Sequence, residues 1–77
     1  MSKEERAVLL LEVYNQEKER LAKESISKKA EIVRQQADKE ISPAEADLKV
    51  MELKAYVEIE SERIERRFLR AICALEG

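Results

Sequence analysis

Four arginines near the end of the chain have the type and spacing that most readily suggest binding chemistry. They share one face of a helix: Arg63, Arg66, Arg67 and Arg70. Residues 63–70 carry a charge of +3, whereas residues 44–62 carry −4. Such guanidinium groups bind phosphate, RNA or an acidic protein. Cations near a helix C-terminus also complement the helix dipole, and Glu62 can pair with Arg66 four residues later. The cluster therefore indicates either a solvated helix face or a contact for an acidic partner, with nucleic acid as the alternative.

An acidic stripe accompanies the arginines. It consists of three glutamates at helical spacing: Glu58, Glu62 and Glu65. Helical bundles can hold di-metal sites, but those sites use Glu-x-x-His pairs, and this sequence has no histidine. The common zinc patterns are absent for the same reason. We therefore interpret the stripe as a solvated face, and we expect neither a metal nor another cofactor.

The candidate nucleophiles are Cys73, the only cysteine, and the serines. A thiol or hydroxyl nucleophile needs a neighbouring base, and histidine is not available to supply it. Cysteine also packs as a small hydrophobic residue. Because no phosphate-binding loop is visible either, we expect neither an enzyme nor a small-molecule substrate.

The composition indicates the elements that hold these residues. Charged residues make up 42% of the chain and hydrophobic residues 44%, with one glycine and one proline. Disorder requires low hydrophobicity, whereas these apolar residues recur at helical spacing, so we expect an all-α fold. A chain of 77 residues forms one domain at most, and a core of that size supplies only about 3–5 kcal/mol. Without a disulfide or a metal, oligomerisation is the remaining source of stability.

One motif divides the chain into two helices. Ser42-Pro43-Ala44-Glu45 combines an N-cap serine, a proline at the first helical position and a glutamate at the third. We predict a single helical-hairpin domain over residues 1–77, with a first helix over about 3–40, a turn at 41–42 and a second helix over about 43–75. The short connection predicts that the helices run antiparallel.

Each predicted helix carries an apolar stripe that should face the other helix. In the second helix only Ser61 interrupts the stripe, which comprises Ala46, Val50, Leu53, Val57, Ser61, Ile64, Phe68, Ala71, Ile72 and Leu75. In the first helix apolar residues recur every eleven positions, in the series Leu11, Ala22 and Val33 and in the pairs Ile26 and Ala37, and Ala30 and Ile41. One register pairs Val33 with Val50 and Ile26 with Val57, and sets Lys18 opposite Glu65. It also predicts a small, polar middle and two apolar ends.

Two regions are more apolar than one hairpin can cover. The first joins the N-terminal segment to the end of the second helix: Val8, Leu9, Leu10, Leu11, Val13 and Tyr14 with Phe68, Leu69, Ile72, Cys73 and Leu75. The second is another stripe on the second helix: Leu48, Met51, Ala55 and Ile59. Such patches mark protein contacts. We expect a homodimer that forms a four-helix bundle with coiled-coil-like packing, although Tyr14 and Phe68 could instead anchor a different protein.

These expectations define a small homo-oligomeric protein–protein interaction module. It would act as an adaptor, co-chaperone or inhibitor of a larger partner by burying apolar helix faces. The alternative is a four-helix-bundle regulator that binds nucleic acid, RNA in preference to DNA, through the arginine face. The net charge of −2 gives no general attraction to nucleic acid or anionic lipid. Glu4, Glu5 and Glu12 argue against membrane-surface binding. With no signal-peptide core and no stretch of transmembrane length, we expect a soluble cytoplasmic protein.

Overall fold

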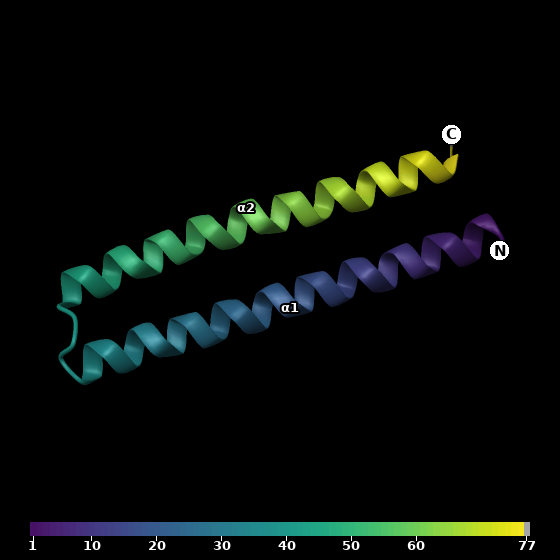
Figure 1. The fold of residues 1–77 in the computed structure, drawn as a ribbon. Helices are drawn as coiled ribbons and strands as arrows, with labels where there is room; N and C mark the ends of the chain where they lie inside the picture. The colour runs from purple at the N-terminus through teal and green to yellow at the C-terminus, as the bar shows by residue number, and fades with distance from the viewer. Residues whose placement is uncertain (77) are drawn as a thin grey trace.

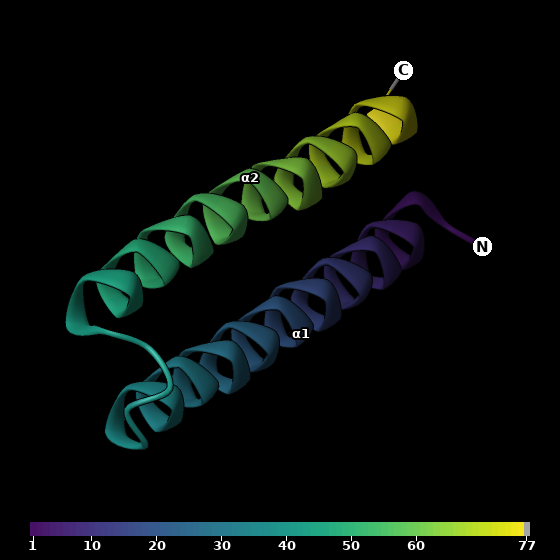
Figure 2. The same ribbon diagram turned by 60° about the vertical axis from the view of Figure 1, so that its left-hand side comes forward.

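Two long helices lie side by side and antiparallel, and a short connection joins them at one end (Figures 1 and 2). They are α1, Lys3–Ala37, and α2, Pro43–Glu76. This computed structural model describes residues 1–76, and no strand occurs within them. The Cα atoms extend over 56 × 16 × 8 Å, so the molecule is a flat rod only two helices wide. The predicted all-α hairpin is confirmed.

Both helices begin at a serine. The Ser2 hydroxyl accepts a hydrogen bond from the Glu5 N–H at 3.1 Å, and Ser42 does the same for the Glu45 N–H at 3.1 Å. Each serine thereby satisfies one of the N–H groups that a helix N-terminus leaves without a partner. The second helix therefore starts at Pro43, where the sequence motif indicates.

Helix α1 ends at Ala37, three residues before the predicted end near Glu40. Lys39 adopts a left-handed φ of 59°. The Glu40 N–H donates to the Gln35 carbonyl at 2.9 Å, and the Lys39 N–H donates to the Gln36 carbonyl at 3.1 Å. This pair of bonds is a Schellman motif, which usually places glycine at the left-handed position. Because lysine occupies that position here, the sequence gives no signal for the end of the helix.

The predicted contact stripe of α2 is confirmed, because each of its members is buried or half-buried in the hairpin. The stripe predicted for α1 is wrong. Leu11, Ile26 and Val33 are exposed at 46%, 69% and 59%. The residues of α1 that face α2 instead fall into three series of seven-residue spacing: Ala7, Tyr14 and Leu21; Leu10, Glu17 and Glu24; and Lys18, Ser25 and Ile32. Helix α1 is thus rotated by about a third of a turn from the predicted orientation.

The axial register of the two helices is nevertheless the predicted one. The Lys18 ammonium lies 3.5 Å from the Glu65 carboxylate. The same ammonium donates a hydrogen bond to the Ser61 hydroxyl. Polar side chains such as Lys18 sit beside the helix contact because their charged ends find partners across it, and this is why apolar residues alone indicate the wrong face of α1.

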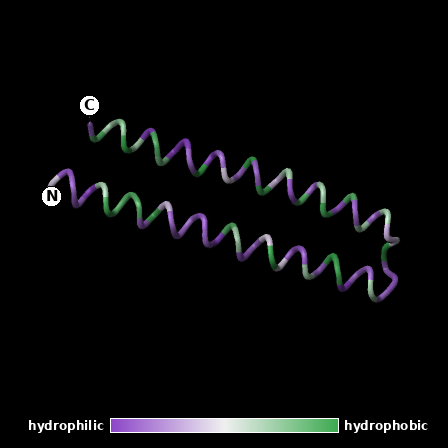
Figure 3. Tube along the Cα trace, turned by 180° about the vertical axis from the view of Figure 1, so that it is seen from behind, coloured by the Kyte–Doolittle hydropathy of each residue, from purple (hydrophilic) through white to green (hydrophobic). Residues whose placement is uncertain are grey.

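Few side chains are buried by the hairpin. Within residues 1–76 the buried hydrophobic residues are Leu21, Ile32, Ala46 and Ile64. Leu21 and Ile64 are buried in the middle of the hairpin, and the polar contacts of Lys18 with Ser61 and Glu65 lie beside them. The middle is therefore polar, as the register predicts, but it encloses two large apolar side chains. Apolar segments alternate with polar ones along both helices (Figure 3). Much of the apolar surface therefore faces solvent.

Candidate interaction surfaces

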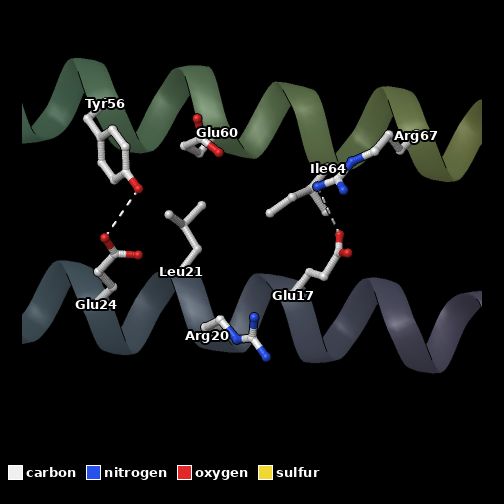
Figure 4. Close-up of a pocket in the computed structure, with 8 residues that line it drawn as sticks. All are labelled: Glu17, Arg20, Leu21, Glu24, Tyr56, Glu60, Ile64 and Arg67. Carbon is white, nitrogen blue, oxygen red and sulfur yellow. Dashed lines mark hydrogen bonds and ion pairs between the residues drawn. The ribbon is translucent and has the colours of Figure 1, made fainter.

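One broad face of the hairpin is tied together by polar contacts between the helices. Its middle is a shallow hollow of about 240 Å³. The Tyr56 hydroxyl donates to the Glu24 carboxylate at 3.2 Å on one side of this hollow, and Arg67 pairs with Glu17 at 3.3 Å on the other. Figure 4 shows Leu21 between these two contacts, with Arg20 pointing away from them. We call this the network face.

The ionisable groups around Tyr56 hold one another in their usual charge states. Lys28 lies 4.6 Å from the centre of the Tyr56 ring and pairs with Glu24 at 3.0 Å. The hydrogen bond from Lys28 makes the largest contribution to lowering the pKa of Glu24, and the hydrogen bond from Tyr56 lowers it further. The hydrogen bond to Glu24 raises the pKa of both Lys28 and Tyr56. Each pKa shift leads away from neutrality, so none of these three groups is tuned for proton transfer near pH 7.

A second polar cluster closes the turn. Arg34 contacts three carboxylates, at 2.5 Å to Glu31, 2.9 Å to Asp38 and 3.3 Å to Glu40. The hydrogen bond from Arg34 lowers the pKa of Glu31. Arg34 therefore links the last turn of α1 to the connection that follows it. Sequence reasoning identified neither this cluster nor the role of Tyr56. Two signals in the sequence could have indicated the turn cluster: Glu31 three residues before Arg34, and Asp38 four residues after it.

The first predicted apolar patch lies at the open end of the hairpin, and the structure divides it. Leu10, Tyr14, Phe68, Ile72 and Leu75 are half-buried between the helices. The Tyr14 and Phe68 rings are 4.7 Å apart at an interplanar angle of 35°, within the range of favourable aromatic pairs. These two rings therefore stabilise the hairpin itself.

The rest of the first patch faces solvent. Val8, Leu9, Val13 and Leu69 are exposed at 55%, 45%, 51% and 58%. Cys73 is also exposed, with a free thiol. The open end of the hairpin thus retains a large apolar surface after the helices have paired.

The second predicted patch is also exposed. Leu48, Met51 and Ile59 have exposed fractions of 57%, 66% and 54%, and Ala55 is exposed beside them. These residues lie on the side of α2 that points away from α1, and we call them the α2 outer stripe. The residues wrongly assigned to the hairpin core, with the alanines between them, form a corresponding α1 outer stripe: Leu11, Ala22, Ile26, Ala30 and Val33.

The predicted arginine face is present, but most of it is paired. Arg63 pairs with Glu60 at 3.2 Å and Arg66 with Glu62 at 3.7 Å, and Arg67 makes the Glu17 contact described above. Within residues 1–76, Arg70 has no carboxylate within ion-pair distance. The predicted pairing of Glu62 with Arg66 is therefore confirmed.

The acidic residues do not gather into a metal-binding group anywhere in residues 1–76. Glu65 contacts Lys18, Glu62 contacts Arg66, and Glu58 lies on the exposed surface. Neither helix, over the described part of the chain, has an apolar segment of the length and purity that a membrane span requires.

Comparison with protein-family models, with curated proteins and with solved structures found no match for this chain.

Proposed function

We propose that this protein is a homodimeric helical interaction module in which two hairpins pack their outer stripes together into a four-helix bundle. The observation that carries the proposal is the distribution of apolar side chains. Four hydrophobic residues are buried by the hairpin, whereas twelve large hydrophobic residues remain exposed within residues 1–76. A monomeric protein rarely leaves apolar surface of this extent open to solvent.

Covering the exposed apolar side chains would also stabilise the protein substantially. Complete burial of a Leu, Ile, Val or Met side chain contributes about 1.5–3 kcal/mol. Leu48, Met51 and Ile59 are each more than half exposed, so covering the α2 outer stripe alone would contribute several kcal/mol. That gain is comparable to the whole stability expected from a small core of about 3–5 kcal/mol.

The placement of the α1 outer stripe suits a bundle. Leu11, Ala22 and Val33 lie about 100° round α1 from the side that faces α2. Met51 and Leu69 lie about 120° round α2, toward the same flank of the hairpin. In a four-helix bundle each helix contacts two neighbours, and a second hairpin placed on this flank provides the second neighbour for both helices.

The two outer stripes also complement each other in size. Both stripes mix large and small residues: Ala22 and Ala30 lie among Leu11, Ile26 and Val33 in the α1 outer stripe, and Ala55 lies among Leu48, Met51 and Ile59 in the α2 outer stripe. Large side chains opposite small ones pack without voids. A two-fold dimer makes each contact twice, with the α1 stripe of either copy against the α2 stripe of the other. This self-complementarity favours a second copy of the chain over an unrelated partner on this surface.

Nucleic-acid binding is less well supported. Arg63, Arg66 and Arg67 each have a carboxylate partner within the hairpin. Phe68, the aromatic residue that lies among them in the sequence, packs against Tyr14, so its ring is partly covered where a base would have to stack.

Light scattering after size exclusion tests the proposal. The chain has a mass of 9.0 kDa, and we expect twice that value at micromolar concentration. The variant Met51→Glu/Leu69→Glu should elute at the monomer mass, because both residues are exposed on the flank where the second hairpin packs, and the substitutions place carboxylates in that interface. As a matched control, Gln16→Glu/Ser27→Glu adds the same charge at exposed positions outside both outer stripes and should remain dimeric. A monomeric wild-type protein, or a dimer that survives the interface substitutions, would contradict the proposal.

A further inference from the structure

An apolar groove of about 420 Å³ runs between the two helices at the open end of the hairpin. Leu9, Leu10 and Val13 of α1 form one wall, Ala71, Ala74 and Leu75 of α2 form the other, and Arg6 stands at the rim. The termini lie at this end (Figure 1), and both helix ends carry apolar segments there (Figure 3). No side chain from residues 1–76 fills the groove.

The shape of the groove suits a helix. The α2 wall is low because Ala71 and Ala74 are small, and the α1 wall carries the larger residues. Toward the middle of the hairpin a smaller hollow of about 110 Å³ continues the channel past Tyr14 and Phe68 to the Glu17–Arg67 pair. From Arg6 to Glu17 the helix rises by about 16 Å, the length of three helical turns. A third helix could therefore lie along the channel with apolar side chains at i, i+3 or i+4, and i+7 above the alanines.

The charge around the groove is positive on both helices. Arg6 on α1 and Arg70 on α2, four residues before Ala74, have no carboxylate within ion-pair distance among residues 1–76. Arg63, Arg66 and Arg67 lie beside Arg70 along α2, and each is paired with a carboxylate. The one carboxylate lining the channel is Glu17, and Arg67 already pairs with it.

The groove lies on the opposite flank of the hairpin from Leu11, Ala22, Met51 and Leu69. Measured from the side of α1 that contacts α2, Leu9 and Val13 lie in the direction of the network face. Leu11 and Ala22 lie about 100° away in the opposite direction. Dimerisation through the outer stripes would leave the groove open. A second copy is also a poor occupant of the groove, because a two-fold contact there brings the same arginines of both copies together.

We infer that this groove binds an amphipathic helix of a different protein, with its apolar side chains in the groove and acidic side chains toward Arg6 and Arg70. The inference deepens the proposed function, since it rests on the protein being an interaction module and names the chemistry of what the dimer recruits. Each dimer presents two such grooves, so it would hold two copies of the partner.

Two labelled peptides of 18 residues test the inference by fluorescence anisotropy. Both carry leucine at i, i+3, i+4 and i+7 spacing, and they differ only in having glutamate or lysine on either side of the leucine stripe. We expect the glutamate peptide to bind wild-type protein about tenfold more tightly than the lysine peptide, because two exposed charge contacts favour one and oppose the other. Equal affinity for both peptides, or no binding of either, would overturn the inference.

Variants of the groove sharpen the test. Arg6→Glu/Arg70→Glu should reverse the preference, so that the lysine peptide binds more tightly. The control Arg20→Glu/Lys39→Glu makes the same charge change away from the groove and should keep the wild-type preference. Leu9→Gln should lower the affinity of the protein for both peptides, because it removes apolar surface of the groove that both peptides contact. A preference that stays the same in the Arg6→Glu/Arg70→Glu variant, despite native helicity by circular dichroism, would refute the charged contact.

Sedimentation of the same samples separates this inference from the proposed function. A dimer that binds neither peptide would refute the groove inference alone, whereas a monomer that binds the glutamate peptide would refute dimerisation alone. Dissociation of the dimer by Leu9→Gln would identify a second copy as the occupant and overturn the inference. A short single-stranded RNA, tested in parallel, should not bind. Arginine-dependent RNA binding with a steep dependence on salt, in the absence of peptide binding, would also overturn it.

Discussion

The two ends of the hairpin differ in how completely contacts within the chain bury their apolar side chains and pair their polar groups. At the turn, Ile32 and Ala46 are buried, a Schellman motif ends α1, Ser42 caps α2 and Arg34 binds the carboxylates around the connection. At the open end, Leu9, Val13 and Leu69 are about half exposed, and the helices are held chiefly by the Tyr14–Phe68 pair. The turn end is closed by local interactions, whereas the open end presents apolar surface to another molecule.

This difference indicates how stability is distributed along the rod. Regions with few buried apolar contacts open at low free energy, so the open end should fray before the turn end unless a second chain covers it. The turn end thus stabilises the hairpin, whereas the open end is suited to binding another protein. The following substitutions test this division, from the largest expected effect to the smallest.

Ile32→Ala should be the most damaging. Ile32 is 9% exposed, and truncating a buried isoleucine to alanine costs about 2–4 kcal/mol in the free energy of unfolding. Ile26→Ala makes the same change at a residue that is 69% exposed in the hairpin. It should cost about 1 kcal/mol if the α1 outer stripe is covered by the second copy. Urea unfolding followed by circular dichroism measures both, and equal losses at the two positions would contradict the burial described for α1.

Leu69→Ala tests the open end. Leu69 is 58% exposed, so an isolated hairpin would lose less than about 0.5 kcal/mol in the free energy of unfolding. Within a dimer that covers this residue the loss should reach about 1–2 kcal/mol. Urea unfolding at high and low protein concentration distinguishes the cases, because the larger loss should appear only where the dimer is populated.

The two capping serines offer a matched pair from opposite ends. Ser42→Ala should lower the free energy of unfolding by about 1 kcal/mol, because it removes the acceptor of the Glu45 N–H bond. Ser2→Ala removes the equivalent bond to Glu5, but the first turn of α1 can fray without disturbing the rest of the rod. Its effect should therefore be smaller. The reverse order in urea unfolding would indicate that the open end is the better ordered of the two.

The smallest effect should come from the cluster at the turn. Arg34 lowers the pKa of Glu31 from its ordinary value of 4.5. Glu31 therefore contributes stability that is complete above about pH 4.5 and is lost as the pH falls through the lowered folded value. In Arg34→Gln the pKa of Glu31, followed by carboxyl chemical shifts, should return toward 4.5. An unchanged titration would show that Arg34 does not hold this carboxylate.

The two helices also differ in how much their sequences reveal. Helix α2 has one contact stripe interrupted only by Ser61, together with a proline start signal, so its position and its buried face could both be predicted. Helix α1 has apolar residues on two faces, and the face that contacts α2 includes Glu17, Lys18 and Glu24. Their charged ends reach partners on α2, which a pattern of apolar residues alone does not reveal.

The candidate surfaces follow the same division. The α2 outer stripe and the arginine face were visible as residue patterns, because both lie on one helix. The α1 outer stripe was assigned to the core, since its orientation depends on the rotation of α1. The groove at the open end combines Leu9 and Val13 with Ala71 and Ala74, so only the paired helices bring its walls together.

Thermal unfolding of the wild-type protein across a wide range of concentration tests the central claim most directly. If a second copy covers the outer stripes, the unfolding midpoint must rise with protein concentration, because dimerisation stabilises the folded state by mass action. We predict a midpoint that increases steadily from low micromolar to high micromolar chain. A midpoint independent of concentration, with the protein well folded at the lowest concentration and monomeric throughout, would contradict the account.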